Sequence, residues 1–173
     1  MGGLLIMRWT NDGKSAPELV IPENCSIASF TQLEDAMNKW LDIVQYGLSQ
    51  GLCGPEYYKE TMLDYPNYTE DKCFFLVENG EAVATLTVVC DYEKKEGYIH
   101  MVACKETCRG KGYGTLLNAL GIKTLKEEGM ETAFLTTNDW RVPAIKSYLR
   151  AGFVPDMSTD DYKERWKIIF ENI

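Results

Sequence analysis

The 173-residue chain is 45% hydrophobic and 25% charged, a composition typical of one globular domain rather than of a disordered or membrane-embedded segment. Its 18 lysines and arginines against 26 aspartates and glutamates give a formal net charge of −8, which argues against nonspecific nucleic-acid binding and mildly favours cationic substrates. No segment approaches the roughly 18 consecutive apolar residues of a membrane span. We therefore predict a single domain, residues 1–173, in a cytoplasmic protein without nucleic-acid or membrane partners.

The use of cysteine and histidine bears on metals and redox state. The six cysteines form no C-x-x-C pair, and the chain has a single histidine. A zinc site needs clustered cysteine and histidine ligands, so we predict no metal. Free cysteines in strands behave as small core residues, which is consistent with a reduced protein. The even number of cysteines leaves disulfides open.

The N-terminal third is predicted to form a strand followed by two helices. The short apolar run Leu4–Met7 suits a first strand. Thr31–Glu34 has the pattern of a capping box and is expected to begin an amphipathic helix. One side of this helix carries Leu33, Met37, Trp40, Leu41 and Val44. After several glycines, Pro55 is expected to open a second helix that runs to about Leu63.

A hairpin and a third strand follow these helices. The apolar runs Phe74–Val77 and Ala82–Val89 are separated by Asn79-Gly80, which suits a type I′ hairpin turn. A charged turn, Glu93–Gly97, then leads into a strand at Tyr98–Cys104.

A glycine-rich run joins that strand to a clear helix, Leu116 to about Glu128, and reads Arg109-Gly110-Lys111-Gly112-Tyr113-Gly114-Thr115. Glycine lets the backbone come close to a ligand, and a helix N-terminus offers N–H donors and a positive dipole end. Because Arg109 and Lys111 add positive charge, we predict a phosphate cradle. The glycine spacing matches neither the dinucleotide-binding nor the P-loop pattern, and a plain strand-to-helix turn is the alternative.

The C-terminal part is predicted to alternate strand and helix. Thr132–Thr137 reads as a strand and Val142–Arg150 as a helix. Gly152 suits a helix C-cap, and Phe153 begins a return strand. Trp166–Phe170 is predicted to be the last strand.

Two motifs together carry a family resemblance. Arg109-x-x-Gly112-x-Gly114 lies between a strand and a helix, and Ala144, Tyr148 and Gly152-Phe153 follow at intervals of four residues. In both motifs the chain resembles the GCN5-related N-acetyltransferase (GNAT) superfamily, over roughly residues 73–170. The resemblance implies a single-domain α/β GNAT fold, with a mixed six- to seven-stranded sheet flanked by about four helices in the order β-α-α-β-β-β-α-β-α-β-β.

The resemblance also implies an N-acetyltransferase that moves an acetyl group from acetyl-CoA, its co-substrate, to a primary amine by direct attack in a ternary complex. Backbone groups at Val102 and Cys104 would hold the pantetheine arm and polarise the thioester carbonyl. Amides of the glycine-rich run would hold the pyrophosphate. The predicted cofactor contacts are Val102, Cys104, Arg109, Gly110, Lys111, Gly112, Tyr113, Gly114, Thr115 and Asn138.

Two residues are predicted to be catalytic. Tyr148 occupies the family's tyrosine position, and a phenol can protonate a departing thiolate without being charged beforehand. His100 is the candidate general base because its unperturbed pKa lies near neutrality. It precedes Val102 by two residues, which places both on one face of a regular strand. Glu96 is the nearest equivalent of the glutamate that other members use, and a core position is the alternative for His100.

One position departs from the family pattern. Many relatives place a cofactor-binding asparagine three residues before the helix alanine, whereas this chain has Arg141 there and Asn138 three residues earlier. The sequence leaves open whether Asn138, Trp140 or Arg141 faces the cofactor or the acceptor.

The sequence indicates the acceptor substrate less clearly than it indicates the cofactor. Family members select it with the first two helices, where the sequence places six aromatic residues, Trp40, Tyr46, Tyr57, Tyr58, Tyr65 and Tyr68. These suggest an aromatic-lined pocket or part of the core. A small amine or amino-acid-like metabolite is the first expectation. A peptide or protein amine is the alternative, as is a non-catalytic acyl-CoA sensor of the same fold, and a monomer or homodimer is expected.

Overall fold

A computed structural model describes residues 3–49, 51 and 53–173, and the other four residues of the predicted domain lie outside the described residues. Within those ranges, seven strands form one mixed sheet in the order β2-β3-β4-β5-β6-β1-β7. Neighbouring strands run antiparallel, except that β5 and β6 are parallel. The strands are β1 Leu5–Thr10, β2 Cys25–Ser29, β3 Cys73–Glu78, β4 Glu81–Asp91, β5 Glu96–Cys104, β6 Thr132–Thr137 and β7 Val154–Pro155.

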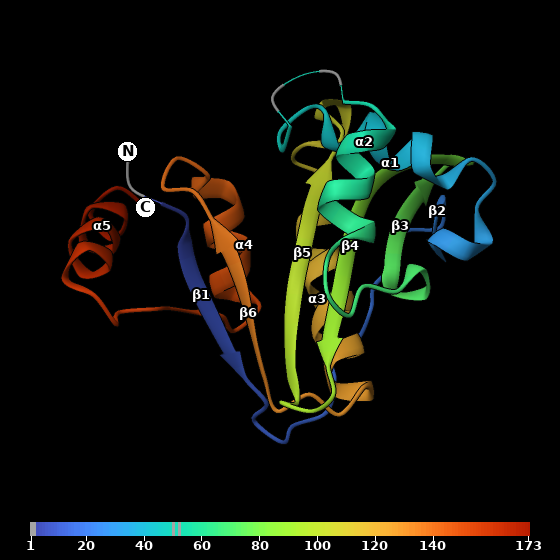
Figure 1. The fold of residues 1–173 in the computed structure, drawn as a ribbon. Coiled ribbons are helices and arrows are strands. Elements are labelled where there is room, and N and C mark those ends of the chain that lie inside the picture. Colours follow the sequence, from blue (N-terminus) through green and yellow to red (C-terminus); the bar gives the residue numbers. More distant parts are fainter. Residues whose placement is uncertain (1–2, 50, 52) are drawn as a thin grey trace.

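Helices cover both faces of this sheet. In Figure 1, α1 and α2 lie in front of the central strands, whereas α3 lies behind β4 and β5. The helices are α1 Ala36–Val44, α2 Pro55–Tyr58, α3 Tyr113–Glu127, α4 Val142–Arg150 and α5 Asp160–Glu171. A π-helical turn, Lys59–Leu63, continues α2, and short 3-10 turns lie at Phe30–Gln32, Glu70–Lys72 and Glu106–Cys108. None of the helices in the described ranges is long and apolar enough to span a bilayer.

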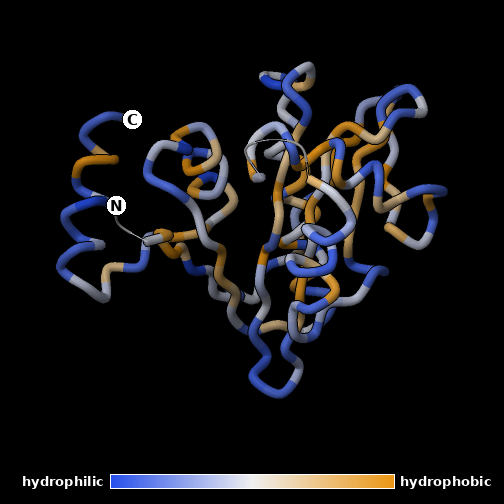
Figure 2. The backbone as a smooth tube through the Cα atoms, turned by 45° about the horizontal axis from the view of Figure 1, so that its top comes forward, coloured by the Kyte–Doolittle hydropathy of each residue, from blue (hydrophilic) through white to orange (hydrophobic). Residues whose placement is uncertain are grey.

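The core is divided between the two faces of the sheet. Leu117 and Leu135 belong to the larger cluster, against which α3 and α4 pack. Trp40 and Phe75 belong to a second cluster beneath α1 and α2. Figure 2 shows the hydrophobic stretches gathered in the central strands and the hydrophilic ones in the outer loops. Burying one such large side chain contributes about 1.5–3 kcal/mol, so each helix is held mainly by its apolar face.

Most predicted elements are present within a few residues. The observed bounds of β6 and α4 are those predicted. The β3–β4 hairpin turns at Asn79 and Gly80 with φ of 50° and 84°, the pair of positive values that a type I′ turn requires. The predicted α/β fold with a mixed sheet of six to seven strands is confirmed, with five α-helices described in place of about four.

Two N-terminal details differ from the predictions. The side chain of Gln32 accepts a hydrogen bond from the backbone N–H of Ser29 at 2.8 Å, so the capping box surrounds a 3-10 turn and does not begin at Thr31. The helix α1 starts only after Asp35. The strand β2 was not predicted, because its half-exposed residues lack the alternation of apolar and polar side chains that marks a strand.

The predicted last strand, Trp166–Phe170, is wrong, because these residues belong to helix α5. The Thr159 side chain accepts a hydrogen bond from the backbone N–H of Tyr162 at 3.1 Å and so caps the helix. Trp166 and Ile169 are buried three residues apart, which is a helical spacing. The cap and this spacing were readable in the sequence, but the short β-branched and aromatic run resembled a strand.

The strand β5 carries one extra residue relative to β4. Thr85 pairs with Ala103 and Thr87 with His100, so two residues of β5 face one of β4. Met101 has a φ of 54° in this β-bulge. A non-glycine residue at positive φ costs about 1–2 kcal/mol, and bulges of this kind re-aim side chains beside functional sites.

The bulge changes which face of the sheet each side chain meets. Ile99 and Val102 pack with the α3 and α4 cluster, whereas Met101 packs with the α1 and α2 cluster. His100 also points to the α1 and α2 side, where its ring contacts Thr61. The prediction that His100 and Val102 share a face is therefore wrong, because it assumed a regular strand.

The parallel pair β5–β6 opens in the middle of the sheet. Pairing runs from Glu96 with Thr132 to Ile99 with Leu135, and the register continues no further along β5. Beyond this point the two strands diverge toward the top of Figure 1, where α3 and α4 begin. The bulge lies directly after the last pair, so it marks the point at which the sheet splits.

Candidate active site

A cavity of about 730 Å³ lies at the split between β5 and β6, a size that suits a small-molecule ligand. It is lined by β5, the start of α3, α4 and the segment after α1. Three arginines line it, Arg109, Arg141 and Arg150, and no aspartate, glutamate or histidine does so among the described residues. In a chain with a net charge of −8, this lining favours an anionic ligand.

The predicted phosphate cradle forms one side of the cavity. Gly110 and Gly112 both have a φ of 79°, a backbone region that favours glycine. Gly112 is the N-cap of α3, so the N–H groups of the first turn have no partner within the helix. A Cβ added at Gly112 would meet nothing within 4 Å, so the backbone there is open to a ligand. The cradle residues that line the cavity are Arg109, Gly110, Gly112, Tyr113, Gly114 and Thr115.

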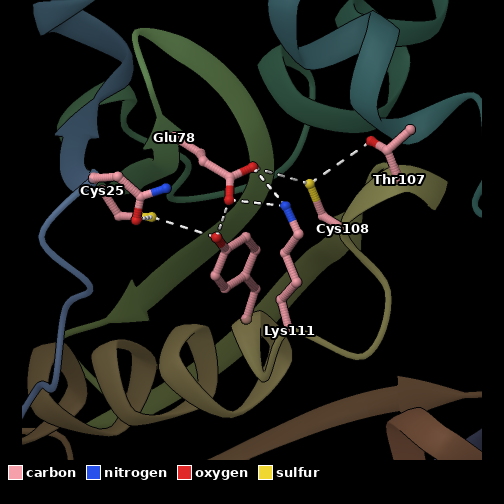
Figure 3. A network of polar contacts seen from close by, with 7 residues as sticks. Cys25, Glu78, Thr107, Cys108 and Lys111 are labelled. Carbon is pink, nitrogen blue, oxygen red and sulfur yellow. Dashed lines mark hydrogen bonds and ion pairs between the residues drawn. The ribbon is translucent and has the colours of Figure 1, made fainter.

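The side chains of Lys111 and Tyr113 turn away from the cradle toward β3. Lys111 Nζ lies 2.9 Å from each carboxylate oxygen of Glu78 (Figure 3). The Tyr113 hydroxyl donates to the same carboxylate. Hydrogen bonds from Tyr113 and Lys111 lower the pKa of Glu78. The charge of Lys111 is thus paired with Glu78 outside the cavity, whereas the sequence analysis had assigned this charge to the phosphate. Glu78 links the cradle to β3.

The backbone of β5 presents donors to the open gap. The Lys105 N–H donates to Val83 O of β4 at 2.9 Å. Because successive N–H groups of a strand point to opposite edges, that of Cys104 points toward β6, and Val102 lines the same cavity. Burial raises the pKa of the Cys104 thiol to about 11, so this thiol is protonated near neutral pH.

Tyr148 lies in the cavity wall that α4 contributes. Its side chain lines the cavity, and the residue is only 6% exposed. Burial raises the pKa of the phenol to about 12, so the hydroxyl carries its proton near neutral pH. The ring packs edge-on against Phe153 with centroids 6.3 Å apart. A fixed, protonated hydroxyl inside the cavity can donate a proton to a ligand.

His100 does not line the cavity. Its ring stacks on Tyr65 and Tyr98, with both centroid distances at 4.9 Å. Its Nε2 lies 3.0 Å from Thr61 O, to which it donates. Burial lowers the pKa of the imidazole, so the ring is neutral in the folded protein near pH 7. These contacts are those of a hydrogen-bonded core residue, the alternative that the sequence left open.

The structure separates the two polar residues of the β6–α4 connection. Asn138 does not line the cavity among the described residues, and its backbone oxygen accepts from Arg141 N at 3.0 Å. Arg141 does line the cavity. The lining residues that the sequence analysis did not single out include Asn118 and Ser147. Asn118 Nδ2 donates to Ser147 Oγ at 2.8 Å. A buried asparagine within the apolar helix α3 was the available signal.

The amide of Asn118 has an unused acceptor. Its Oδ1 is buried and has no hydrogen-bond partner in the part of the chain that the structure describes. Leaving a buried polar atom unpaired costs about 1–3 kcal/mol. A ligand N–H in the cavity would satisfy this oxygen, as an amide of a pantetheine arm could.

Residues 36–153 match the model of the acetyltransferase (GNAT) family. The chain belongs to this family. The match spans α1 to α4 and therefore contains the cradle, the bulged strand and Tyr148. The resemblance carried by the two sequence motifs is confirmed.

Curated relatives of this GNAT chain are longer than it is. A mycothiol acetyltransferase from Streptomyces bingchenggensis is 28% identical over 143 residues, which cover 79% of this chain and 45% of the relative. The chain thus spans about half the length of the curated relatives it matches.

Solved structures show the same GNAT fold. A GCN5-related N-acetyltransferase from Sphaerobacter thermophilus superimposes with a TM-score of 0.70 at 18% identity, over 88% of this chain and 48% of that one. The ribosomal-protein-S18-alanine N-acetyltransferase from Escherichia coli gives a TM-score of 0.61 at 21% identity, over 75% of this chain and 77% of that one.

The aromatic residues near α1 and α2 of the GNAT chain are mostly core. Trp40 and Tyr58 are 0% and 3% exposed and pack edge-on, and Tyr58 shares a 2.9 Å hydrogen bond with Tyr68. Tyr65 stacks on His100. Of the six aromatic residues proposed for an acceptor pocket, Tyr46 lines the cavity. Most of these aromatic residues therefore belong to the core and do not form an acceptor pocket.

The cysteines and the acidic side chains bear on the predictions about disulfides and metals. All six cysteines lie in the described ranges, and each is a free thiol. Among residues 3–49, 51 and 53–173, no three histidine, cysteine, aspartate or glutamate side chains are grouped as metal ligands.

Replacing His100 by phenylalanine is expected to flatten the dependence of stability on pH. The unfolded chain binds a proton at His100 below a pKa of about 6.5, whereas burial lowers the pKa of the folded ring. The unfolding free energy of the wild type therefore falls as pH decreases below about 6.5. The unfolding free energy of the variant does not fall in this way. The variant does lose the hydrogen bond to Thr61, which lowers its unfolding free energy by about 1 kcal/mol at every pH.

Thermal unfolding at pH 5, 6, 7 and 8 measures this difference. The deficit of the His100→Phe variant should be largest at pH 8 and shrink toward pH 5, where the wild type has lost its advantage. Tyr65→Phe, which keeps the stacked ring and adds no titrating group in this range, should differ from the wild type by a constant amount. A constant deficit for His100→Phe as well would show that the ring does not resist protonation.

Proposed function

We propose that this GNAT chain transfers an acetyl group from acetyl-CoA to a primary amine, by direct attack within a ternary complex. The observation that carries the proposal is the cavity at the β5–β6 split, which joins a glycine cradle at a helix N-terminus to a buried, protonated Tyr148. Membership of the GNAT family supports the acetyltransferase activity, and this arrangement supports the use of acetyl-CoA. The nature of the acceptor is proposed.

Acetyl-CoA fits the groups that line the cavity. Its phosphates would lie at the start of α3, where the first-turn N–H groups have no partner within the helix, Gly110 and Gly112 line the cavity, and Arg109 adds positive charge. Its pantetheine arm would lie along β5, where the Cys104 N–H points into the gap and Val102 lines the cavity. A backbone N–H group of this strand would also stabilise negative charge on the thioester oxygen during transfer.

The protein's chemical role in the transfer is small. The amine nitrogen would form a bond to the acetyl carbon as the bond from carbon to sulfur breaks. Tyr148 would give its proton to the departing sulfur and regain one from water. Cys104 is protonated near neutral pH because burial raises its pKa to about 11. A protonated thiol is a poor nucleophile, so direct transfer to the amine is favoured over an acetylated enzyme.

The amine must lose one proton during the reaction. With no carboxylate or imidazole lining the described part of the cavity, the proton passes to water, either before the amine binds or at the open end of the cavity. His100 lies on the other side of β5, outside the cavity, and so cannot act as the base.

Two alternatives are weighed against this proposal. The similarity of fold to the ribosomal-protein-S18-alanine N-acetyltransferase keeps a peptide or protein amine open as acceptor. A non-catalytic acyl-CoA sensor would use the cradle but have no need of a buried phenol at the reacting end of the cavity. We place a small amine or an amino-acid-like acceptor first, because the cavity is lined from both faces of the sheet and is of small-molecule size.

Calorimetric titration with acetyl-CoA tests the proposal, with adenosine diphosphate as the control ligand. Saturable binding that requires the pantetheine arm is expected, followed by acetylation of amines detected by mass spectrometry. Binding without acetylation of any small amine or peptide would favour the sensor. Absence of binding at millimolar acetyl-CoA would exclude both roles.

A further inference from the structure

Arg141 connects the two sides of the split sheet. It lies between β6 and α4, and its Nη2 donates to the backbone oxygen of Gly47 in the segment after α1. The guanidinium also lies over the Trp140 ring, 5.0 Å from its centroid. Gly47, Trp140 and Arg141 all line the cavity. The side chain therefore reaches across the cavity toward the α1 and α2 face.

The hydrogen-bonding capacity of Arg141 is only partly used. Its Nε is buried and has no partner within the described residues, and none of the ion pairs found there includes Arg141. Burial lowers the pKa of the guanidinium, which means that its positive charge is held at a cost. A partly buried charge of this kind is stabilised when an anion binds beside it.

The other two cavity arginines belong to the cofactor side. Arg109 is part of the cradle, and Arg150 also lines a second hollow of about 480 Å³ together with Thr115 of α3. In the proposed function, the phosphates of acetyl-CoA would bind on this α3 face of the sheet. Arg141 instead donates a hydrogen bond to Gly47, which follows α1 on the other face of the sheet. The anion that Arg141 would bind is therefore a different one from the phosphates.

We propose that Arg141 binds a carboxylate on the acceptor, so that the substrate is an amine that also carries an acid group. The inference rests on the proposed function and names the substrate class for the same cavity. A guanidinium offers a planar pair of donors that matches a carboxylate. Bound to Arg141, an amino acid or the end of a short peptide would hold its amine within the cavity that Tyr148 lines.

Neighbouring contacts hold this arginine in place. Arg165 of α5 donates from Nε to Asp139 Oδ2 at 2.9 Å, which fixes the connection before α4. The Asn138 oxygen accepts from the backbone of Arg141, closing a turn. A donor that is already positioned loses less conformational entropy when its ligand binds, so this anchoring favours a binding role.

The test compares L-amino acids with their carboxamides as acceptors, using the full chain and acetyl-CoA. The wild type should acetylate acids with a kcat/KM roughly 10- to 100-fold above that of matched amides, because charge-assisted hydrogen bonds have about this worth. The amides have the less basic amines, so greater availability of neutral amine cannot produce this preference. Arg141→Gln should remove the preference and leave the Kd for acetyl-CoA unchanged.

Two further variants control for charge and folding. Arg141→Lys keeps the charge but loses the planar pair of donors, and should retain part of the preference. Lys167→Gln removes one positive charge from an exposed position on α5 and should keep the wild-type ratio. Melting temperatures of all variants establish that each is folded.

The outcomes separate the inference from the proposed function. Equal use of acids and amides by the wild type would overturn the inference, as would binding of acetyl-CoA with no acetylation of either set. Weakened acetyl-CoA binding in Arg141→Gln, with the acid preference intact, would assign Arg141 to the cofactor instead. If the wild type does not bind acetyl-CoA, the proposed function itself fails before any acceptor is compared.

Discussion

Replacing Gly112 by tryptophan is expected to abolish acetyl-CoA binding while the chain still folds. A Cβ at this position meets nothing within 4 Å, so a side chain can begin there without a clash with the core. It would project from the N-cap of α3, where the phosphates need bare backbone N–H groups. Loss of two such charge-assisted hydrogen bonds lowers the affinity by roughly 10²- to 10⁴-fold.

The chain offers a matched control in Gly129. This glycine has a φ of 74°, close to the 79° of Gly112, and its Cβ position is also open. Each tryptophan variant should therefore carry the same backbone penalty of about 1–2 kcal/mol. Calorimetry should find binding in Gly129→Trp and none in Gly112→Trp. Equal binding by both variants would exclude the cradle as the phosphate site.

The cradle, β6 and α4 could be predicted because their signals are local. Glycines at positive φ, a strand of six residues and a helix between Val142 and Arg150 each depend on neighbours in the chain. The hairpin at Asn79-Gly80 was readable for the same reason. Spacing then placed Tyr148 on α4, and the structure puts that side chain in the cavity wall.

The bulge and Arg141 could not be predicted because their causes are not local. A β-bulge at Met101 depends on how β4 and β5 pair, and one extra residue puts His100 and Val102 on opposite faces of the sheet. The direction of Arg141 depends on the backbone oxygen of Gly47, which is 94 residues away in the sequence. Lys111 likewise turned to Glu78, a partner from another strand.

Replacing Tyr148 by phenylalanine is expected to lower kcat on the order of 10²-fold, the usual worth of a positioned general acid. The ring and its edge-on packing against Phe153 are kept, so the Kd for acetyl-CoA and the melting temperature should stay close to those of the wild type. Only the hydroxyl is lost. Because burial raises its pKa to about 12, this hydroxyl is protonated throughout the neutral range in the wild type.

Tyr58→Phe provides the matched control for the loss of a buried phenol. Burial raises the pKa of Tyr58 to about 12 as well, and its hydroxyl bonds to Tyr68 at 2.9 Å outside the cavity. This variant should lose some stability and keep its kcat. A solvent isotope effect on kcat should be present in the wild type and in Tyr58→Phe.

The isotope effect distinguishes proton donation from packing at Tyr148. If the phenol protonates the departing sulfur, the effect on kcat should change in Tyr148→Phe, since the proton must then come from water. A normal kcat combined with weakened acetyl-CoA binding would instead make Tyr148 a packing residue of the pantetheine channel. That result would leave the cavity without a proton donor of its own at the sulfur, and transfer would depend on the cradle and the β5 backbone alone.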